Sequence, residues 1–208
     1  MIPLFVDCSK RRIVIFGGGD VAARKSAYFA GVAEVTVVSR SFGQTIRDRD
    51  VIHKECDVST ESDKSLESIL DGAFLVIAAL SDNIQNNRIG RLCRKLGILF
   101  NNADGEHGDV ILPSVTGGIN YTLAISTNGS SPAISRFIRE HLEQEFPALD
   151  EMIALQLRLR TELKRAEPDQ VKRNAILWEV LKDPSIWNAL SADTAEAWKL
   201  VKKRYLHD

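Results

Sequence analysis

A run of three glycines, residues 17–19, stands between a short apolar strand pattern and a helical pattern. The segment GGGDVA, residues 17–22, fits the spacing G-x-G-x-x-A. In such a turn Gly17 permits the sharp bend, Gly19 lets a pyrophosphate approach the backbone, and Ala22 allows the helix to lie close to the strand. The phosphates would meet the amides at the positive end of the helix. The turn therefore predicts a dinucleotide site with contacts from Gly17, Gly18, Gly19, Asp20 and Val21.

Strand and helix patterns alternate around this turn. We expect strands at 12–16, 34–38, 51–58, 73–79 and 98–101. We expect helices at 20–30, 65–70 and 83–96. This alternation predicts an α/β fold with a parallel sheet that is covered on both faces.

The pattern changes after the fifth expected strand. Residues 109–112 and 121–126 have strand character with no helix between them, which predicts a hairpin-like or interleaved element. Ser131 and Pro132 are a typical helix start, because serine caps free amides and proline suits the first helical position. That helix is expected to end before Pro147, and the rest of the chain has only helical patterns, broken near Pro168 and Pro184.

Composition excludes several classes of protein. The 208 residues are 44% hydrophobic and 26% charged, with a net charge of -1, so nothing global indicates nucleic acid or a membrane surface as partner. No run of apolar residues is long enough for a membrane span, and no secretory signal is recognisable. The three cysteines, Cys8, Cys56 and Cys93, are odd in number and far apart in the sequence, so we expect no disulfide framework. This favours a reduced, cytoplasmic chain. We expect no metal site, because the histidines are scattered and no Cys-x-x-Cys pair occurs.

The second strand ends without the acidic residue that usually reads the adenosine ribose in NAD-binding proteins. Ser39, Arg40 and Ser41 stand there instead. Arg40 could accept a 2′-phosphate, or it could stack on adenine while the serines bind an unmodified ribose. These residues leave NAD and NADP open, and the remaining predicted cofactor contacts are Ser39, Arg40, Ser41 and Ala79.

Six segments in order resemble one known family. They are PLFVD (3–7), IVIFGGGDVAARK (13–25), LVIAALSDNIQNNRI (75–89), NNAD (101–104), DVILPS (109–114) and AISTNGSSPAISRFIRE (124–140). These segments resemble precorrin-2 dehydrogenases, including the N-terminal module of sirohaem synthase. The resemblance covers roughly residues 3–147 and is far more specific than the glycine turn alone.

The resemblance implies three parts: an NAD-binding Rossmann domain (1–113), a central dimerisation segment with an exchanged element (114–147) and a small all-helical C-terminal domain (148–208). It also implies NAD as the cofactor, a homodimer, and a stand-alone enzyme that lacks the methyltransferase domain of sirohaem synthase. The sequence departs from the family pattern at Arg40, where many members have a neutral residue or proline.

The implied reaction oxidises the tetrapyrrole precorrin-2 to sirohydrochlorin, which removes one hydride and one proton. Asp104, which follows the fifth strand and matches the aspartate that the resemblance marks as functional, is the expected proton acceptor. An ordinary carboxylate is a poor base, so partial burial would have to raise its basicity. Asp109 and His107 are alternatives, and Asp104 in Ala-Asp-Gly could also be a simple turn residue.

The polar segment before the helix at Pro132 suits the acetate and propionate carboxylates of the substrate. Hydroxyls, amides and the helix dipole can together bind an anion there. Arg136 on the helix could pair with a further carboxylate, or it could simply be solvated. The predicted substrate contacts are Thr127, Asn128, Gly129, Ser130 and Arg136.

Two other functions fit the same residues. A related activity is the insertion of iron into sirohydrochlorin, in which Asp104 would take protons from pyrrole nitrogens. A different class is a Rossmann dimer that senses NAD without catalysis. The latter explains the glycine turn but not Asn101 to Asp104 or the polar loop before an arginine-bearing helix.

Overall fold

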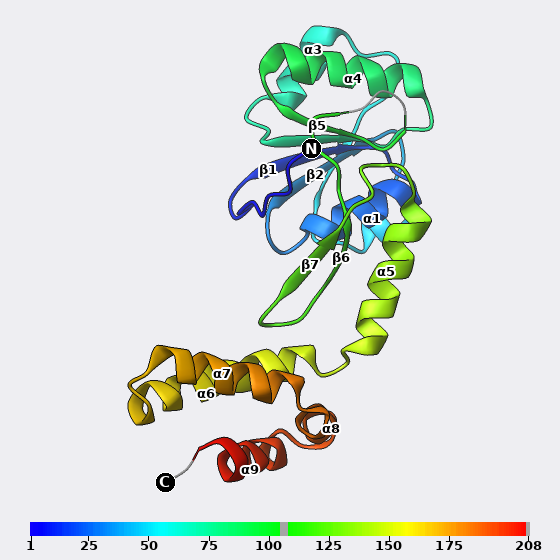
Figure 1. The fold of residues 1–208 in the computed structure, drawn as a ribbon. Helices are drawn as coiled ribbons and strands as arrows, with labels where there is room; N and C mark the ends of the chain where they lie inside the picture. The colour runs from blue at the N-terminus through cyan, green and yellow to red at the C-terminus, as the bar shows by residue number, and fades with distance from the viewer. Residues whose placement is uncertain (105–107, 207–208) are drawn as a thin grey trace. The chain divides into compact units, whose positions relative to one another are not determined.

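The computed structural model describes residues 1–104 and 108–206 of the chain. The chain forms two compact units, Met1–Leu112 and Pro113–Asp208 (Figure 1). The finer division into a dimerisation segment and a helical domain stays a prediction. Among the described residues, no helix combines the length and the apolar content that a membrane span requires.

The first unit contains a five-stranded parallel sheet with the strand order β3-β2-β1-β4-β5. Its strands are β1 (Arg12–Phe16), β2 (Glu34–Ser39), β3 (Ile52–Glu55), β4 (Leu75–Ala78) and β5 (Leu99–Asn102). Its helices are α1 (Asp20–Phe29), α2 (Gln44–Arg47), α3 (Asp63–Leu70) and α4 (Asn83–Leu96). The predicted parallel sheet is confirmed, although the third strand is shorter than expected and the four-residue α2 was not predicted.

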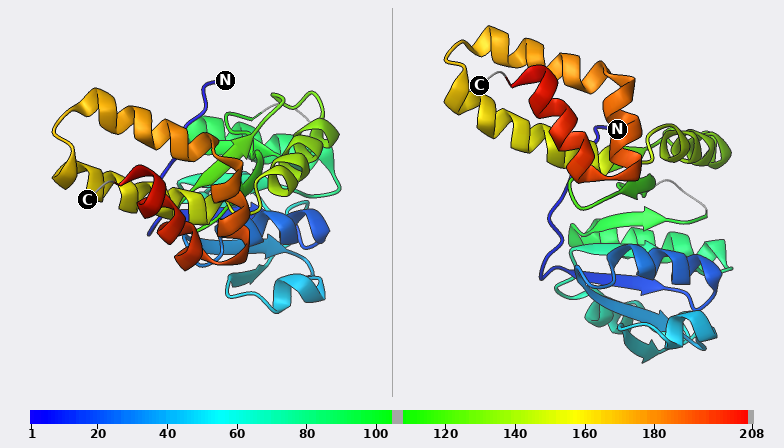
Figure 2. Two further views of the ribbon diagram at one scale, coloured as in Figure 1. Left: turned by 60° about the horizontal axis from the view of Figure 1, so that its bottom comes forward. Right: turned by 90° about the horizontal axis from the view of Figure 1, so that it is seen from below.

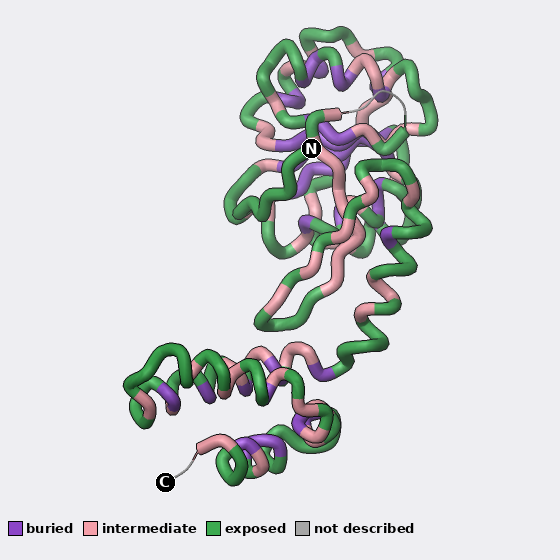
Figure 3. Tube along the Cα trace, viewed as in Figure 1, coloured by how far each residue is buried: buried purple, intermediate pink, exposed green. Residues whose placement is uncertain are grey.

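Alternate residues of β1 build two cores on opposite faces of the sheet. Ile13 and Ile15 pack in a cluster with buried residues of α1 and α2. Val14 and Phe16 pack in another cluster with α3 and α4. Figure 1 shows α1 on one side of the sheet and α3 and α4 on the other, and Figure 3 shows the buried strands between them. Because side chains alternate along a strand, the unbroken apolar run from Ile13 to Phe16 in β1 specifies a sheet that is covered on both faces.

The second unit begins with a two-stranded antiparallel sheet, β6 (Ser114–Gly117) and β7 (Thr122–Ile125). The hairpin was expected, but its first strand was predicted at 109–112, and that placement is wrong. Val110 and Leu112 instead pack against the core of the first unit. The amide of Val110 donates to the main-chain oxygen of Phe100, so this segment lies beside β5.

Five helices complete the second unit: α5 (Pro132–Glu145), α6 (Leu149–Ala166), α7 (Gln170–Lys182), α8 (Pro184–Ala192) and α9 (Thr194–Tyr205). Ser131 caps α5 as expected, because its hydroxyl accepts a hydrogen bond from the amide of Ile134 at 3.4 Å. Helices α6 to α9 enclose their own core around Leu159 and Ile186, and Figure 2 shows them gathered together in both views. The breaks near Pro168 and Pro184 are confirmed, and a further break at Asp193, which caps α9, separates α8 from α9.

Candidate active site

A pocket of about 690 Å³ lies at the carboxyl edge of the parallel sheet, where β1 and β4 are neighbours and the strand order reverses. Open α/β sheets bind ligands at this switch point. All nine predicted cofactor contacts line the pocket, and so does the predicted proton acceptor. These residues are Gly17, Gly18, Gly19, Asp20, Val21, Ser39, Arg40, Ser41, Ala79 and Asp104.

Gly17 makes the sharp turn out of β1. Its φ is +130°, which is strained for any residue with a side chain, and a Cβ there would lie 2.5 Å from the main-chain oxygen of Ala79. Its amide donates to the main-chain oxygen of Val38 at 2.9 Å. Ala22 is fully buried behind the turn. The predicted roles of Gly17 and Ala22 therefore agree with the local geometry.

Gly18 has a role that sequence reasoning did not assign. A Cβ at Gly18 would lie 1.8 Å from the main-chain oxygen of Ser41. The main-chain oxygen of Gly18 also accepts a hydrogen bond from the amide of Gly43 at 2.9 Å. The glycine turn is thus packed directly against the loop that follows β2.

Gly19 is different, because a Cβ there would meet no protein atom within 4 Å. Gly19 occupies the N-cap position of α1, and among the described residues no side chain accepts a hydrogen bond from the first amides of the helix. Those amides have no intrahelical partner, and the helix dipole is positive there. The open space over Gly19 and the uncapped helix end together fit a pyrophosphate group.

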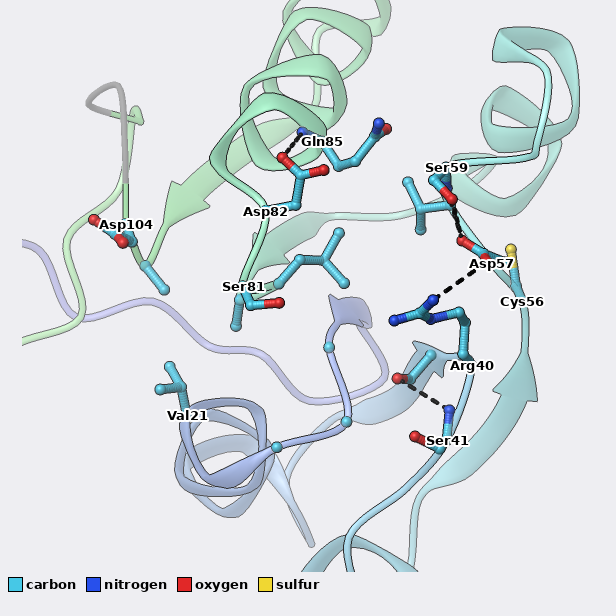
Figure 4. A pocket seen from close by; sticks show the side chains of 18 of the residues that line it. Val21, Arg40, Ser41, Cys56, Asp57, Ser59, Ser81, Asp82, Gln85 and Asp104 are labelled. Atoms are coloured by element: carbon cyan, nitrogen blue, oxygen red, sulfur yellow. Dashed lines mark hydrogen bonds and ion pairs between the residues drawn. The ribbon is translucent and has the colours of Figure 1, made fainter.

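An ion pair lies at the side of the pocket that is formed by the ends of β2 and β3. Nη1 of Arg40 lies 3.6 Å from Oδ2 of Asp57, whose Oδ1 accepts hydrogen bonds from the amide and the hydroxyl of Ser59 at 3.0 and 2.6 Å. The hydrogen bonds from Ser59, with a smaller contribution from Arg40, lower the pKa of the Asp57 carboxyl below its usual value. Arg40 is therefore matched by an acid from the neighbouring strand end (Figure 4).

Asp104 and the Arg40–Asp57 pair lie on opposite sides of the pocket in Figure 4. Asp104 is exposed at the rim, so the partial burial expected for a base is not seen in the described residues. Its main chain is held on both sides: the amide donates to Oδ1 of Asn102, and the oxygen accepts from Nδ2 of Asn86, both at 3.4 Å. Asp109 is exposed too, and the other alternative, His107, lies outside the described residues.

The predicted substrate contacts lie in the second unit. Asn128 and Gly129 have φ of +53° and +83°, and the amide of Ser130 donates to the main-chain oxygen of Thr127, which closes a tight turn. The Thr127 hydroxyl accepts from the amide of Ser131 and donates to its oxygen, both at 3.0 Å, so it stabilises the loop itself.

Arg136, on the first turns of α5, is largely exposed. Its Nε donates to Oε1 of Glu140 at 2.7 Å, one helical turn further on. The arginine is thus already paired on its own helix, and a substrate carboxylate would have to exchange with an exposed partner.

Sequence reasoning missed the pocket residues that follow the third and fourth strands. The missed residues include Cys56, Asp57, Val58 and Ser59 after β3, and Leu80, Ser81, Asp82 and Gln85 after β4. The available signal was positional, because every parallel strand end faces the same edge. In the part of the chain that the structure describes, no group of three or more His, Cys, Asp or Glu side chains could hold a metal ion.

Comparisons with known proteins give this site its context. A family model described as NAD(P)-binding matches residues 4–114, and one described as "Sirohaem biosynthesis protein central" matches residues 122–145. A precorrin-2 dehydrogenase of Methanosarcina barkeri is 38% identical over 201 residues, which cover 94% of this chain and 89% of that protein. The chain belongs to the precorrin-2 dehydrogenase family. Its first unit is therefore an NAD(P)-binding domain of that family.

Other members of this wider group are longer. A siroheme synthase of Azotobacter vinelandii is 29% identical over 98% of this chain, but the match spans only 44% of that protein. The precorrin-2 dehydrogenase family is thus homologous to a part of siroheme synthase. The solved structure of the precorrin-2 dehydrogenase SirC superposes with a TM-score of 0.70 over 98% of this chain at 21% identity, which supports the fold of the chain.

Proposed function

We propose that this chain oxidises precorrin-2 to sirohydrochlorin with NAD as the hydride acceptor, on the way to sirohaem. The observation that carries the proposal is that the whole glycine turn and Asp104 line the same pocket, at the switch point of the sheet, in a member of this family. Neither the turn nor the carboxylate alone would indicate this reaction, since each occurs in many unrelated proteins.

The reaction removes a hydride and a proton from the tetrapyrrole. The dinucleotide, when bound, supplies the acceptor for the hydride. Gly19 and the N-terminus of α1 would seat its pyrophosphate, and Ser39 and Ser41 would contact the adenosine ribose. Asp104 would take the proton, and a macrocycle lying over the rim would exclude water from this exposed carboxylate.

The turn at residues 127–130 and Arg136 would bind substrate carboxylates. Support comes from the position of this turn at the N-terminus of α5, where the helix dipole favours anions. Exchange of the exposed Glu140 partner of Arg136 for a substrate carboxylate would cost little, because exposed ion pairs contribute about 0–1 kcal/mol.

We also propose that two copies of the chain associate through residues 114–147. The exposed fractions of the α5 residues Ile134, Phe137 and Ile138 are 49%, 66% and 38%, and that of Ile119 in the hairpin is 94%. Apolar residues in such number on one short segment are typical of an interface, and a second copy is the occupant that the resemblance implies. Phe137→Glu should shift a dimer to monomer in sedimentation, whereas a wild-type chain that sediments as a monomer would refute the proposal.

The decisive experiment mixes the purified chain with precorrin-2 and NAD under anaerobic conditions. The absorbance of sirohydrochlorin and that of NADH should rise together in equal amounts. If the chain binds NAD and neither product forms, the NAD-sensing function replaces this proposal. Addition of sirohydrochlorin and Fe²⁺ tests the chelatase alternative, which requires insertion above the spontaneous rate. The expected cytoplasmic location stays a prediction.

A further inference from the structure

We propose that Asp57 is the residue by which this chain selects NAD over NADP. The inference rests on the proposed function, because it assigns a role within the same dinucleotide pocket. The second strand offers Arg40 where NAD-binding proteins usually place an acid. The segment that follows the third strand supplies the missing carboxylate.

The register of the sheet brings the two side chains together. Ser39, the last residue of β2, is paired with Glu55, the last residue of β3. The amide of Cys56 continues the pairing by donating to the main-chain oxygen of Ser39 at 3.0 Å. Arg40 and Asp57 therefore leave the sheet side by side, and both line the pocket.

The Asp57 carboxylate is fixed more firmly than its partner. Its Oδ1 accepts two hydrogen bonds from Ser59, and these bonds favour the ionised form. The Arg40 side chain is 76% exposed and approaches Oδ2 only to 3.6 Å. The hydrogen-bonded group at this rim is thus a negative charge, and the arginine is an exposed cation that is already compensated.

These properties distinguish the two cofactors. A carboxylate accepts hydrogen bonds from the 2′-hydroxyl of the adenosine ribose in NAD. The same carboxylate repels the 2′-phosphate of NADP, and it also competes with that phosphate for Arg40. Removal of the charge from Asp57 should therefore release Arg40 and open the site to NADP.

The test is a fluorescence titration of the full chain with NADH and with NADPH. The variant is Asp57→Asn, which keeps the shape and an acceptor for Ser59. The wild-type chain should bind NADH more tightly, and Asp57→Asn should improve the affinity for NADPH relative to NADH by about tenfold or more. Glu55→Gln is the matched control, because Glu55 is an exposed acid two residues before Asp57, at the end of β3, and does not line the pocket. It should leave the ratio unchanged.

A second variant keeps the test sharp. In Asp57→Asn combined with Arg40→Met, the gain in NADPH affinity should disappear, since the released guanidinium is its source. An unchanged cofactor ratio in a folded Asp57→Asn chain would overturn the inference and leave the proposed function standing. A wild-type chain that prefers NADPH would overturn it too. A wild-type chain that binds neither dinucleotide would remove the proposed function together with the inference.

Discussion

The buried side chain of Asn86 donates a hydrogen bond to the main-chain oxygen of Asp104 at 3.4 Å, which links α4 to the turn that follows β5. The same side chain also pairs with the main chain of Leu80: Nδ2 donates to its oxygen at 2.9 Å, and Oδ1 accepts from its amide at 3.0 Å. Asn86 thus holds two loops of the pocket at once.

Asn86→Ala should remove both hydrogen bonds from the main chain of Leu80, in a partly buried setting. We expect a loss of about 1–3 kcal/mol in the free energy of unfolding, measured by urea denaturation. Turnover should fall as well, because the Asp104 turn loses a support. Asn188→Ala, at an exposed position of α8, is the control and should change neither quantity. Wild-type stability in Asn86→Ala would mean that water or another side chain replaces the amide.

Gly19→Asp should abolish dinucleotide binding without unfolding the chain. The fold has room for the side chain, since a Cβ at Gly19 meets nothing within 4 Å. The added negative charge would lie where the pyrophosphate is expected, so the Kd for NADH should rise by about 100-fold or more. Gly18→Ala is the instructive contrast: its Cβ collides with Ser41, so the melting temperature should fall. Unchanged NADH affinity in Gly19→Asp would refute the placement of the pyrophosphate.

Asp104→Asn should bind NADH as the wild type does and should lose turnover of precorrin-2 by about 10²- to 10⁴-fold, the usual contribution of a general base. Single-turnover absorbance measurements at saturating NAD separate these two quantities. Asp109→Asn is the matched variant, because among the described residues it removes the next exposed carboxylate after Asp104. If Asp109→Asn loses the activity and Asp104→Asn retains it, the proton acceptor is Asp109.

The three cysteines should react with an alkylating reagent at very different rates. Burial, with a smaller contribution from Asp109, raises the pKa of the Cys93 thiol to about 12. Since only the thiolate reacts, Cys93 should stay unmodified in the folded chain at pH 8 and become reactive only on unfolding. Cys56 lines the pocket and Cys8 does not, so NADH should slow the labelling of Cys56 alone. Peptide mass spectrometry reads each site, and rapid native labelling of Cys93 would contradict its burial.

The parallel sheet was predictable because its signals are local. A glycine turn after an apolar strand, and a helix that ends at Gly97 with φ of +68°, are each visible in a few consecutive residues. The first strand of the hairpin was not predictable in the same way. Residues 110–112 are apolar because Val110 and Leu112 pack against the core beside β5, and packing of an irregular segment leaves the same pattern as a buried strand.

The candidate site shows the same limit. The glycine turn and Asp104 could be read from short motifs, and all of these residues line one pocket. Asp57 could not, since its importance depends on the register between β2 and β3, which places it beside a residue far from it in the sequence. Pairing across a sheet is a tertiary property that a single sequence does not display.

The contact between the glycine turn and the loop after β2 has a consequence for ligand size. The main-chain oxygen of Gly18 accepts a hydrogen bond from the amide of Gly43, and Gly18 has no space for a side chain against Ser41, so the two loops are packed directly against each other. If one loop binds the pyrophosphate and the other binds the adenosine ribose, the distance between the loops sets the distance between these two groups of the bound cofactor. A dinucleotide analogue with one extra methylene between phosphate and adenosine would occupy the pyrophosphate position or the ribose position, but not both at once.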